Sequence, residues 1–244
     1  MTRKALVTGG ASGIGAAIAR QLATDGLHIV VADRDAEAAE TFAGEIGGEA
    51  WVVDLSDAAA LEDLRLDCDV LVNNAGIQRV APIHEFAPED FRLIQRLMLE
   101  APFLLVRAAL PHMYAQGWGR VINVSSAHGL RASAFKVAYV CAKHGLEGLS
   151  KVTALEGAPH GVTSNCINPG YVRTPLVEQQ IADQAATHGI PEDEVIEKIM
   201  LTRSAIKSLI EPADVGALAG FLASEPARMV TGTSYVMDGG WTAQ

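Results

Sequence analysis

Three side chains in the middle of the sequence have the types and spacing for acid–base chemistry on a carbonyl or an alcohol. Tyr139 and Lys143 lie four residues apart in a predicted helix, so they share one of its faces. The neighbouring ammonium is expected to lower the pKa of the tyrosine toward neutral pH. Such a tyrosine gives a proton to a carbonyl oxygen or takes one from an alcohol. Ser126 ends a predicted strand and can hydrogen-bond the same oxygen.

A glycine-rich loop near the N-terminus has the pattern of a dinucleotide-binding turn. The loop, Thr8-Gly9-Gly10-Ala11-Ser12-Gly13-Ile14-Gly15, lies between a predicted strand and a predicted helix. Its glycines let the backbone approach a pyrophosphate, whose charge the helix N-terminus favours. Such a loop alone is weak evidence, but an acid at the end of the next strand makes the pattern strong.

That acid is Asp33, whose carboxylate can accept hydrogen bonds from the adenosine ribose. It would repel a 2′-phosphate, because two unit charges about 4 Å apart interact by about 4 kcal/mol at an effective dielectric near 20. The sequence therefore favours NAD, although the neighbouring Arg34 could accommodate NADP. Asp54 and Leu55 follow the third strand, where Asp54 either caps the next helix or touches the adenine. Asn73-Asn74-Ala75-Gly76 ends the fourth strand, where small residues let a ligand pass close to the backbone.

Short β-rich runs alternate with helical ones along the whole chain, which predicts a single α/β domain with a doubly wound, parallel, seven-stranded sheet. The chemical motifs fall at predicted strand ends or on the following helices, where such sheets bind ligands. The strands are expected at Ala5–Thr8, His28–Ala32, Ala50–Val53, Val70–Asn73, Arg120–Val124, Thr163–Ile167 and Ser234–Met237. The helices are expected at Gly13–Asp25, Ala36–Ile46, Asp57–Leu64, Pro88–Tyr114, Ala138–Gly157 and Pro212–Ser224.

Residues 175–208 interrupt this alternation with mixed helix and loop. A long insertion at the binding edge of a sheet is often a substrate lid, and a surface excursion is the alternative.

The composition excludes several other classes of protein. A net charge of −10 argues against a nucleic-acid partner, and the apolar runs are too short to span a membrane. No metal-ligand spacing occurs, and the chain begins without the pattern of a signal peptide. Cys68, Cys141 and Cys166 cannot all pair, so we expect reduced thiols in a cytoplasmic protein that acts on a small molecule.

Together the glycine loop, Asn73–Gly76, Ser126, Tyr139, Lys143 and Pro169-Gly170 resemble the short-chain dehydrogenase/reductase family over essentially the whole chain. The resemblance implies a Rossmann-type fold, an NAD(P)-linked alcohol/ketone reaction and a homotetramer. By matching position, Tyr139 would be the acid/base. Lys143 would adjust the pKa of Tyr139 and bind the nicotinamide ribose. Ser126 would polarise the carbonyl, while the backbone of Val172 and the side chain of Thr174 would hold the nicotinamide end.

One position departs from the family pattern. The family usually carries an asparagine on the fourth helix that anchors a proton-relay water, and Met98 takes its place here. Methionine cannot replace those hydrogen bonds. Pro102 disturbs the same helix, so a freed carbonyl offers water another anchor.

Four stretches resemble one branch of the family, the 3-hydroxybutyrate dehydrogenases: 76–78, 126–130, 174–181 and the tail 238–244. This resemblance would gather Gln78, His128, Lys136 and Gln180 around a substrate carboxylate, with Tyr171 and Trp241 lining its apolar end. Two amides, an imidazole and an ammonium provide the donors that an anion needs.

The favoured hypothesis is therefore an NAD-dependent dehydrogenase of 3-hydroxybutyrate or a similar short hydroxy acid. One alternative is a 3-oxoacyl or other ketone reductase. Another, of a different class, is an NAD(H)-binding sensor protein that has lost turnover. Met98 would allow that alternative, whereas the intact Ser126, Tyr139 and Lys143 argue against it.

Overall fold

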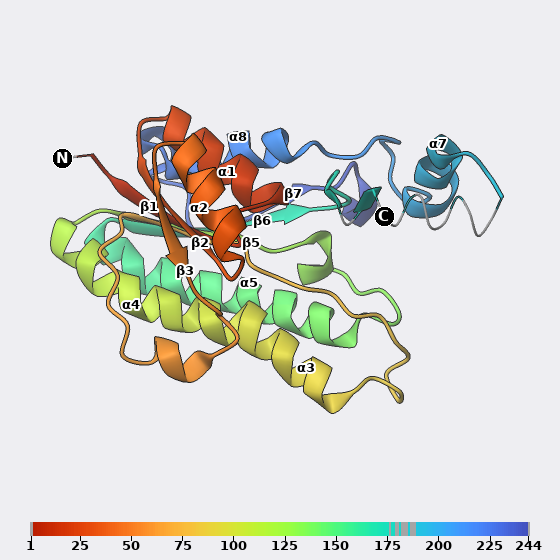
Figure 1. The fold of residues 1–244 in the computed structure, drawn as a ribbon, viewed down its shortest axis with the longest axis horizontal. Helices are drawn as coiled ribbons and strands as arrows, with labels where there is room; N and C mark the ends of the chain where they lie inside the picture. Colours follow the sequence, from red (N-terminus) through yellow and green to blue (C-terminus); the bar gives the residue numbers. More distant parts are fainter. Residues whose placement is uncertain (1, 176, 179–180, 182–184, 186–188, 244) are drawn as a thin grey trace.

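Seven parallel strands form one sheet in the order β3-β2-β1-β4-β5-β6-β7 (Figure 1). The computed structural model describes residues 2–175, 177–178, 181, 185 and 189–243. The strand order reverses between β1 and β4, so the loops that follow these two strands open a crevice between them. The strands are β1 Lys4–Thr8, β2 His28–Asp33, β3 Glu49–Val52, β4 Val70–Asn73, β5 Gly119–Val124, β6 Val162–Pro169 and β7 Ser234–Met237.

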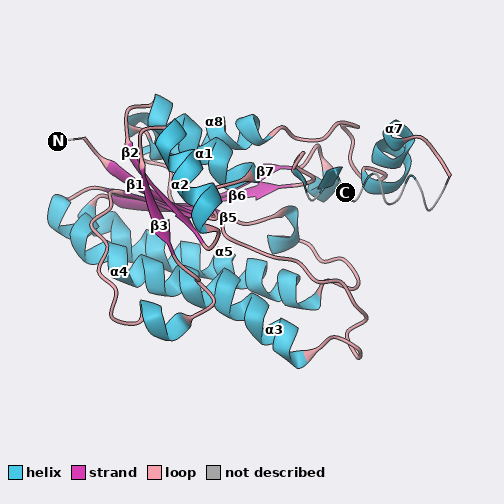
Figure 2. Cartoon of the chain, viewed as in Figure 1, coloured by secondary structure: helices cyan, strands magenta, loops and turns pink. Residues whose placement is uncertain are grey.

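Helices cover both faces of the sheet, as the buried, continuous apolar strands require (Figure 2). On one face Ile18 and Leu22 of α1 and Phe42 of α2 pack with Val215 and Leu222 of α8. The other face carries α3, α4 and α5. The helices are α1 Gly13–Thr24, α2 Ala36–Glu45, α3 Pro88–Gln95, α4 Ala101–Gln116, α5 Val137–Gly157, α7 Glu192–Val195 and α8 Pro212–Ala223.

The predicted fold class is confirmed, but the helix expected at Asp57–Leu64 is wrong. The structure has only a short 3₁₀ turn, Ala58–Leu61, in which the side chain of Asp57 accepts from Ala60 N. Leu61 is the buried residue of this turn. An α-helix of this length is marginal, because nucleating its first turn costs more than its few hydrogen bonds return.

The helix expected at Pro88–Tyr114 is divided by a π turn, Arg96–Glu100, between α3 and α4. The N–H of Ala101 donates to the carbonyl of Arg96, five residues back. Pro102 has no N–H and cannot bond the Met98 carbonyl four residues back. The chain therefore widens its helix around Met98, at the end that faces the crevice.

The described part of the 175–208 segment lies beyond the carboxyl ends of the strands, where Figure 1 shows α7 standing apart from the sheet. Val195, Met200, Leu201 and Leu209 form a small apolar cluster of their own there, with Ile181. In the part of the chain that the structure describes, no helix combines the length and apolarity needed to cross a membrane. The three cysteines are unpaired.

Candidate active site

The glycine loop after β1 folds tightly because two of its glycines take a left-handed conformation. Gly9 has φ +59° and Gly13 has φ +53°, which side chains rarely tolerate. A Cβ at Gly15 would collide with the Gly9 carbonyl oxygen, so Gly15 lets α1 pack against the loop. Gly9, Ser12, Gly13 and Ile14 line the crevice, whereas Gly15, predicted as a cofactor contact, lies behind them.

The N-terminus of α1 has free donors for an anion. The N-cap residue Ser12 makes no capping hydrogen bond with its side chain, and the first turn has no acidic residue. The exposed N–H groups and the helix dipole of such a terminus favour a negatively charged group. A pyrophosphate fits this position.

Asp33 ends β2 with its carboxylate turned toward the loop. Its oxygens accept from Ala11 N and Asp35 N, each at 3.2 Å, which fixes the side chain beside the crevice. Arg34 also lines the crevice. Asp54 does not cap the next helical turn, because Asp57 is the N-cap residue there. Asp54 instead accepts from the N and Oγ of Ser56 and lines the crevice with Leu55. The hydrogen bonds from the Ser56 side chain and backbone lower the pKa of Asp54.

The segment after β4 closes the other side of the crevice through hydrogen bonds to β1. Thr8 Oγ1 accepts from Asn74 N at 2.9 Å and from Ala75 N at 3.1 Å. The Asn74 amide donates to the carbonyls of Thr8 and Gly9. These bonds hold Asn74, Ala75 and Gly76 along the crevice wall.

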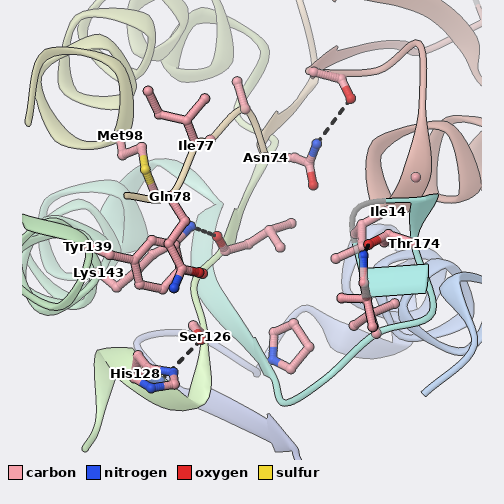
Figure 3. A pocket seen from close by; sticks show the side chains of 18 of the residues that line it. Ile14, Asn74, Ile77, Gln78, Met98, Ser126, His128, Tyr139, Lys143 and Thr174 are labelled. Atoms are coloured by element: carbon pink, nitrogen blue, oxygen red, sulfur yellow. Dashed lines mark hydrogen bonds between the residues drawn. The ribbon is translucent and has the colours of Figure 1, made fainter. Parts of the chain in front are cut away.

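The three predicted catalytic side chains come together at one end of this crevice (Figure 3). Lys143 is buried, and its Nζ donates to the Val124 carbonyl at 2.6 Å and lies 5.7 Å from the centre of the Tyr139 ring. Ser126 is nearly buried, and its Oγ accepts from His128 N at 3.1 Å. Tyr139 and Ser126 both face the cavity, so one substrate oxygen can contact both hydroxyls.

The expected lowering of the Tyr139 pKa is wrong for the protein alone. Burial raises the pKa of Tyr139, and its hydrogen bond with Ser126 opposes the rise without reversing it. The Lys143 ammonium is directed to the Val124 carbonyl, and burial lowers the pKa of this lysine to about 8. For both residues burial is therefore the largest influence on the pKa.

Five of the six predicted substrate contacts beyond the catalytic residues line the same cavity: Gln78, His128, Lys136, Tyr171 and Trp241. Gln180 lies outside the described residues. His128 Nε2 shares a hydrogen bond of 2.9 Å with Ser133 Oγ, and its ring lies 5.4 Å from that of Trp241. Burial, followed by the charge of Lys136, lowers the pKa of His128 to about 4, so the imidazole is neutral near pH 7.

The end of β6 brings Pro169, Gly170, Val172 and Thr174 to the cavity wall. Sequence reasoning missed Ser133, Arg203 and Asp238. The guanidinium of Arg203 lies 4.8 Å from the centre of the Trp241 ring, and the carboxylate of Asp238 accepts from Trp241 N. The Asp-Gly-Gly-Trp turn was a usable signal for Asp238, whereas Arg203 stood in a segment without periodicity.

The whole cavity encloses about 1190 Å³ and extends from Asp33 to Tyr139 and Trp241. This volume exceeds the range of about 300–1,000 Å³ typical of single-ligand pockets. The bare N-terminus of α1, the carboxylate at one end and the acid–base group at the other fit a nicotinamide dinucleotide with a small substrate beside it.

Met98 is buried in the π turn and packs against Ile94, Ala138 and Ala142. A Cβ at Gly76 would lie 3.2 Å from its Cε, so the thioether occupies the space beside the cofactor crevice. The side chain offers no strong hydrogen-bond donor or acceptor.

Met98→Asn would restore the amide that anchors a proton-relay water in the family. We expect it to change kcat by less than about tenfold, because about 2 kcal/mol is only the upper bound for immobilising an ordered water and the usual cost is much smaller. Steady-state kinetics should compare it with wild type and with Met98→Leu, which keeps the volume and the apolar character. A silent wild type beside an active asparagine variant would contradict this expectation and favour a sensor protein.

This fold and site define an oxidoreductase that uses a nicotinamide dinucleotide. The family model for short chain dehydrogenases matches residues 3–185, and the chain belongs to that family. It is 46% identical to a D-beta-hydroxybutyrate dehydrogenase of Rhizobium meliloti, with all of both chains covered. It is also 46% identical to one of Cupriavidus necator, over 99% of this chain and 98% of that one. A solved structure of a proposed 2-deoxy-D-gluconate 3-dehydrogenase from Agrobacterium tumefaciens, with NADP bound, matches with a TM-score of 0.87. The two are 35% identical, with 99% and 97% of the chains covered.

Proposed function

We propose that this dehydrogenase interconverts D-3-hydroxybutyrate and acetoacetate with NAD as its cofactor. The observation that carries the proposal is one cavity in which the hydroxyls of Ser126 and Tyr139 lie in the same lining as the ammonium of Lys136 and the indole of Trp241. A short hydroxy acid presents the matching groups: an alcohol, a carboxylate and a small apolar end. The two relatives named for this activity support the assignment.

The protein's own side chains supply the proton chemistry. In the oxidation, the Tyr139 phenolate accepts the proton of the substrate hydroxyl, while the Ser126 hydroxyl donates a hydrogen bond to the same oxygen. Lys143 favours the phenolate through its charge. A nicotinamide dinucleotide held beside these side chains would supply the hydride-transfer chemistry at the alcohol carbon. Gly9, Ser12, Asp33, Asn74 and Thr174 are among the residues that would hold the dinucleotide.

Lys136 supplies the charge for the substrate carboxylate. Burial lowers the pKa of Lys136, which means that its ammonium is partly desolvated and has much to gain from an anion. Gln78 and the neutral His128 add hydrogen-bond donors without further charge. Gln180 belongs to the same proposed set. Ile199, Met200 and Thr202 line the cavity from the 175–208 segment, which we propose acts as a lid.

The direct test is NADH formation with D- and L-3-hydroxybutyrate, other short hydroxy acids and the matching uncharged alcohols. We expect turnover with the D enantiomer and a preference for NAD over NADP of at least tenfold in kcat/KM. Turnover confined to bulkier ketones or 3-oxoacyl compounds would overturn the substrate assignment.

The preference for NAD is expected to depend on Asp33. Asp33→Ala should narrow the gap between NAD and NADP, because the like-charge repulsion at the 2′ position is removed. Glu37→Ala, which removes an exposed acid in the first turn of α2, is the matched control and should leave the preference unchanged. If wild type preferred NADP, Arg34 and not Asp33 would determine the cofactor preference.

A further inference from the structure

Glu147 is a buried carboxylate on α5, the helix that also carries Tyr139 and Lys143. It lies four residues after Lys143 and eight after Tyr139, along one side of α5. Its exposed fraction is 5%, and that of Lys143 is 4%. A charged side chain is seldom buried this deeply without a partner, because desolvation is costly. The cavity described above does not include Glu147 among its lining residues.

The Glu147 carboxylate accepts hydrogen bonds from two neutral side chains, one on β6 and one on β7. Asn168 Nδ2, at the end of β6, donates to Oε1 at 2.6 Å, and Ser234 Oγ, at the start of β7, donates to Oε2 at 2.6 Å. Since both oxygens accept, the group has the hydrogen-bond pattern of an ionised carboxylate. Asn168 Nδ2 also donates to the main-chain carbonyl of Ser126 at 2.9 Å. One amide therefore links Glu147 to the backbone of a predicted catalytic residue.

Glu147 is also the negative charge that acts on Lys143 from behind. Burial lowers the pKa of Lys143 to about 8, whereas Cys166 and Glu147 act to raise it. Burial strongly raises the pKa of the Cys166 thiol, so Cys166 is uncharged when Lys143 titrates. Of these two groups, Glu147 is therefore the one whose carboxylate, with both oxygens accepting hydrogen bonds, provides the negative charge that acts on Lys143.

Among the described residues, several other titratable groups line the same cavity as Lys143. At its catalytic end they include Tyr139 on α5, His128 and Lys136 before it, and Asp238 after β7. His128, with a pKa of about 4, is neutral, and the Lys136 ammonium disfavours a second positive charge. The Asp238 carboxylate accepts from the backbone N–H groups of Gly240, Trp241 and Thr242. None of these groups duplicates a carboxylate behind the lysine.

We propose that Glu147 is a positioning residue for the catalytic group: its buried charge keeps Lys143 in the ammonium form, and its bond to Asn168 fixes the backbone at Ser126. The proposal rests on the dehydrogenase chemistry set out under Proposed function. It predicts that removing the charge, with the shape kept, shifts the protonation of Lys143 rather than simply loosening the fold.

The test is Glu147→Gln, read out first by NMR titration of ¹³Cε-labelled lysine. The chain has six lysines, and Lys143→Met identifies the Lys143 signal. Without the carboxylate the ammonium loses its proton more readily, so the pKa of Lys143 should fall by about one pH unit. The alkaline limb of the kcat/KM profile for alcohol oxidation should lie at lower pH in Glu147→Gln than in wild type, by a similar amount.

Two further variants separate charge from structure. Glu156→Gln removes an exposed acid from the same helix and should move neither readout. Ser234→Ala keeps the carboxylate but removes one of its hydrogen bonds. It should lower the melting temperature while shifting the pKa of Lys143 less than Glu147→Gln does. If Glu147→Gln does not fold, Glu147→Met, which replaces the buried charge with an apolar chain of similar length, should show the same shift.

An unchanged Lys143 titration in a folded Glu147 variant would overturn the proposal. This outcome is separate from the fate of the proposed substrate, because the NMR titration needs no turnover. If the wild-type enzyme failed with 3-hydroxybutyrate, the substrate assignment would fall while the titration still decided the role of Glu147.

Discussion

Tyr139→Phe is expected to lower kcat for alcohol oxidation by about 100- to 10,000-fold, the usual loss when a positioned acid–base group is removed. The substitution deletes one oxygen and keeps the ring, which packs beside Met98 and Ala142 in an apolar cluster. The folded structure and NAD binding should therefore change little. Stopped-flow and steady-state rates, the melting temperature and a fluorescence titration with NADH would separate these effects.

The matched control for this variant is Tyr114→Phe. Tyr114 is on α4, where its ring stacks on His160 at 4.0 Å, outside the cavity. The Tyr114→Phe variant also loses one phenolic hydroxyl group but should retain wild-type turnover. Near wild-type rates in a folded Tyr139→Phe protein would remove the acid–base role from Tyr139 and, with it, the mechanism proposed above.

Lys136→Ala is expected to raise KM for a short hydroxy acid by about 10- to 100-fold, since a hydrogen bond to a charged group contributes about 1.5–3 kcal/mol. The uncharged alcohol of the same length has no carboxylate to lose, so its kcat/KM should be nearly unchanged. Discrimination between acid and alcohol should fall accordingly. Lys151→Ala, which removes an exposed ammonium from α5, is the control.

The same lysine gives a pH dependence with a definite sign. Because burial lowers the pKa of Lys136, its ammonium is lost at a lower pH than that of an ordinary lysine. KM for the acid should rise as the pH climbs toward that value, while KM for the uncharged alcohol stays level. A KM for the acid that is unaffected by Lys136→Ala would place the ammonium in solvent and favour a different ketone substrate.

Features that depend on neighbours along the chain could be predicted before the fold was known. The alternation of strands and helices predicted the parallel sheet, and the strand-loop-helix context of Gly9–Gly15 predicted the phosphate-binding turn. The four-residue spacing of Tyr139 and Lys143 placed them on one helix face, because helical periodicity is a local property. The resemblance to a family then indicated the roles that these positions carry, and the fold and the family are confirmed.

Features that depend on segments far apart in the sequence became visible in the folded chain. The segment expected as a helix at Asp57–Leu64 forms only a 3₁₀ turn, because so short a helix is marginal. The missing N–H of Pro102 accompanies a π turn around Met98, which the sequence pattern alone did not predict. The pKa of Tyr139 rises because burial, which the sequence spacing does not report, outweighs the hydrogen bond with Ser126. Glu147 reads as an ordinary helical glutamate until Asn168 and Ser234, 21 and 87 residues further along the chain, enclose its carboxylate. Desolvation and charge effects sum over everything that surrounds a group in space, so they are known only once the chain has folded.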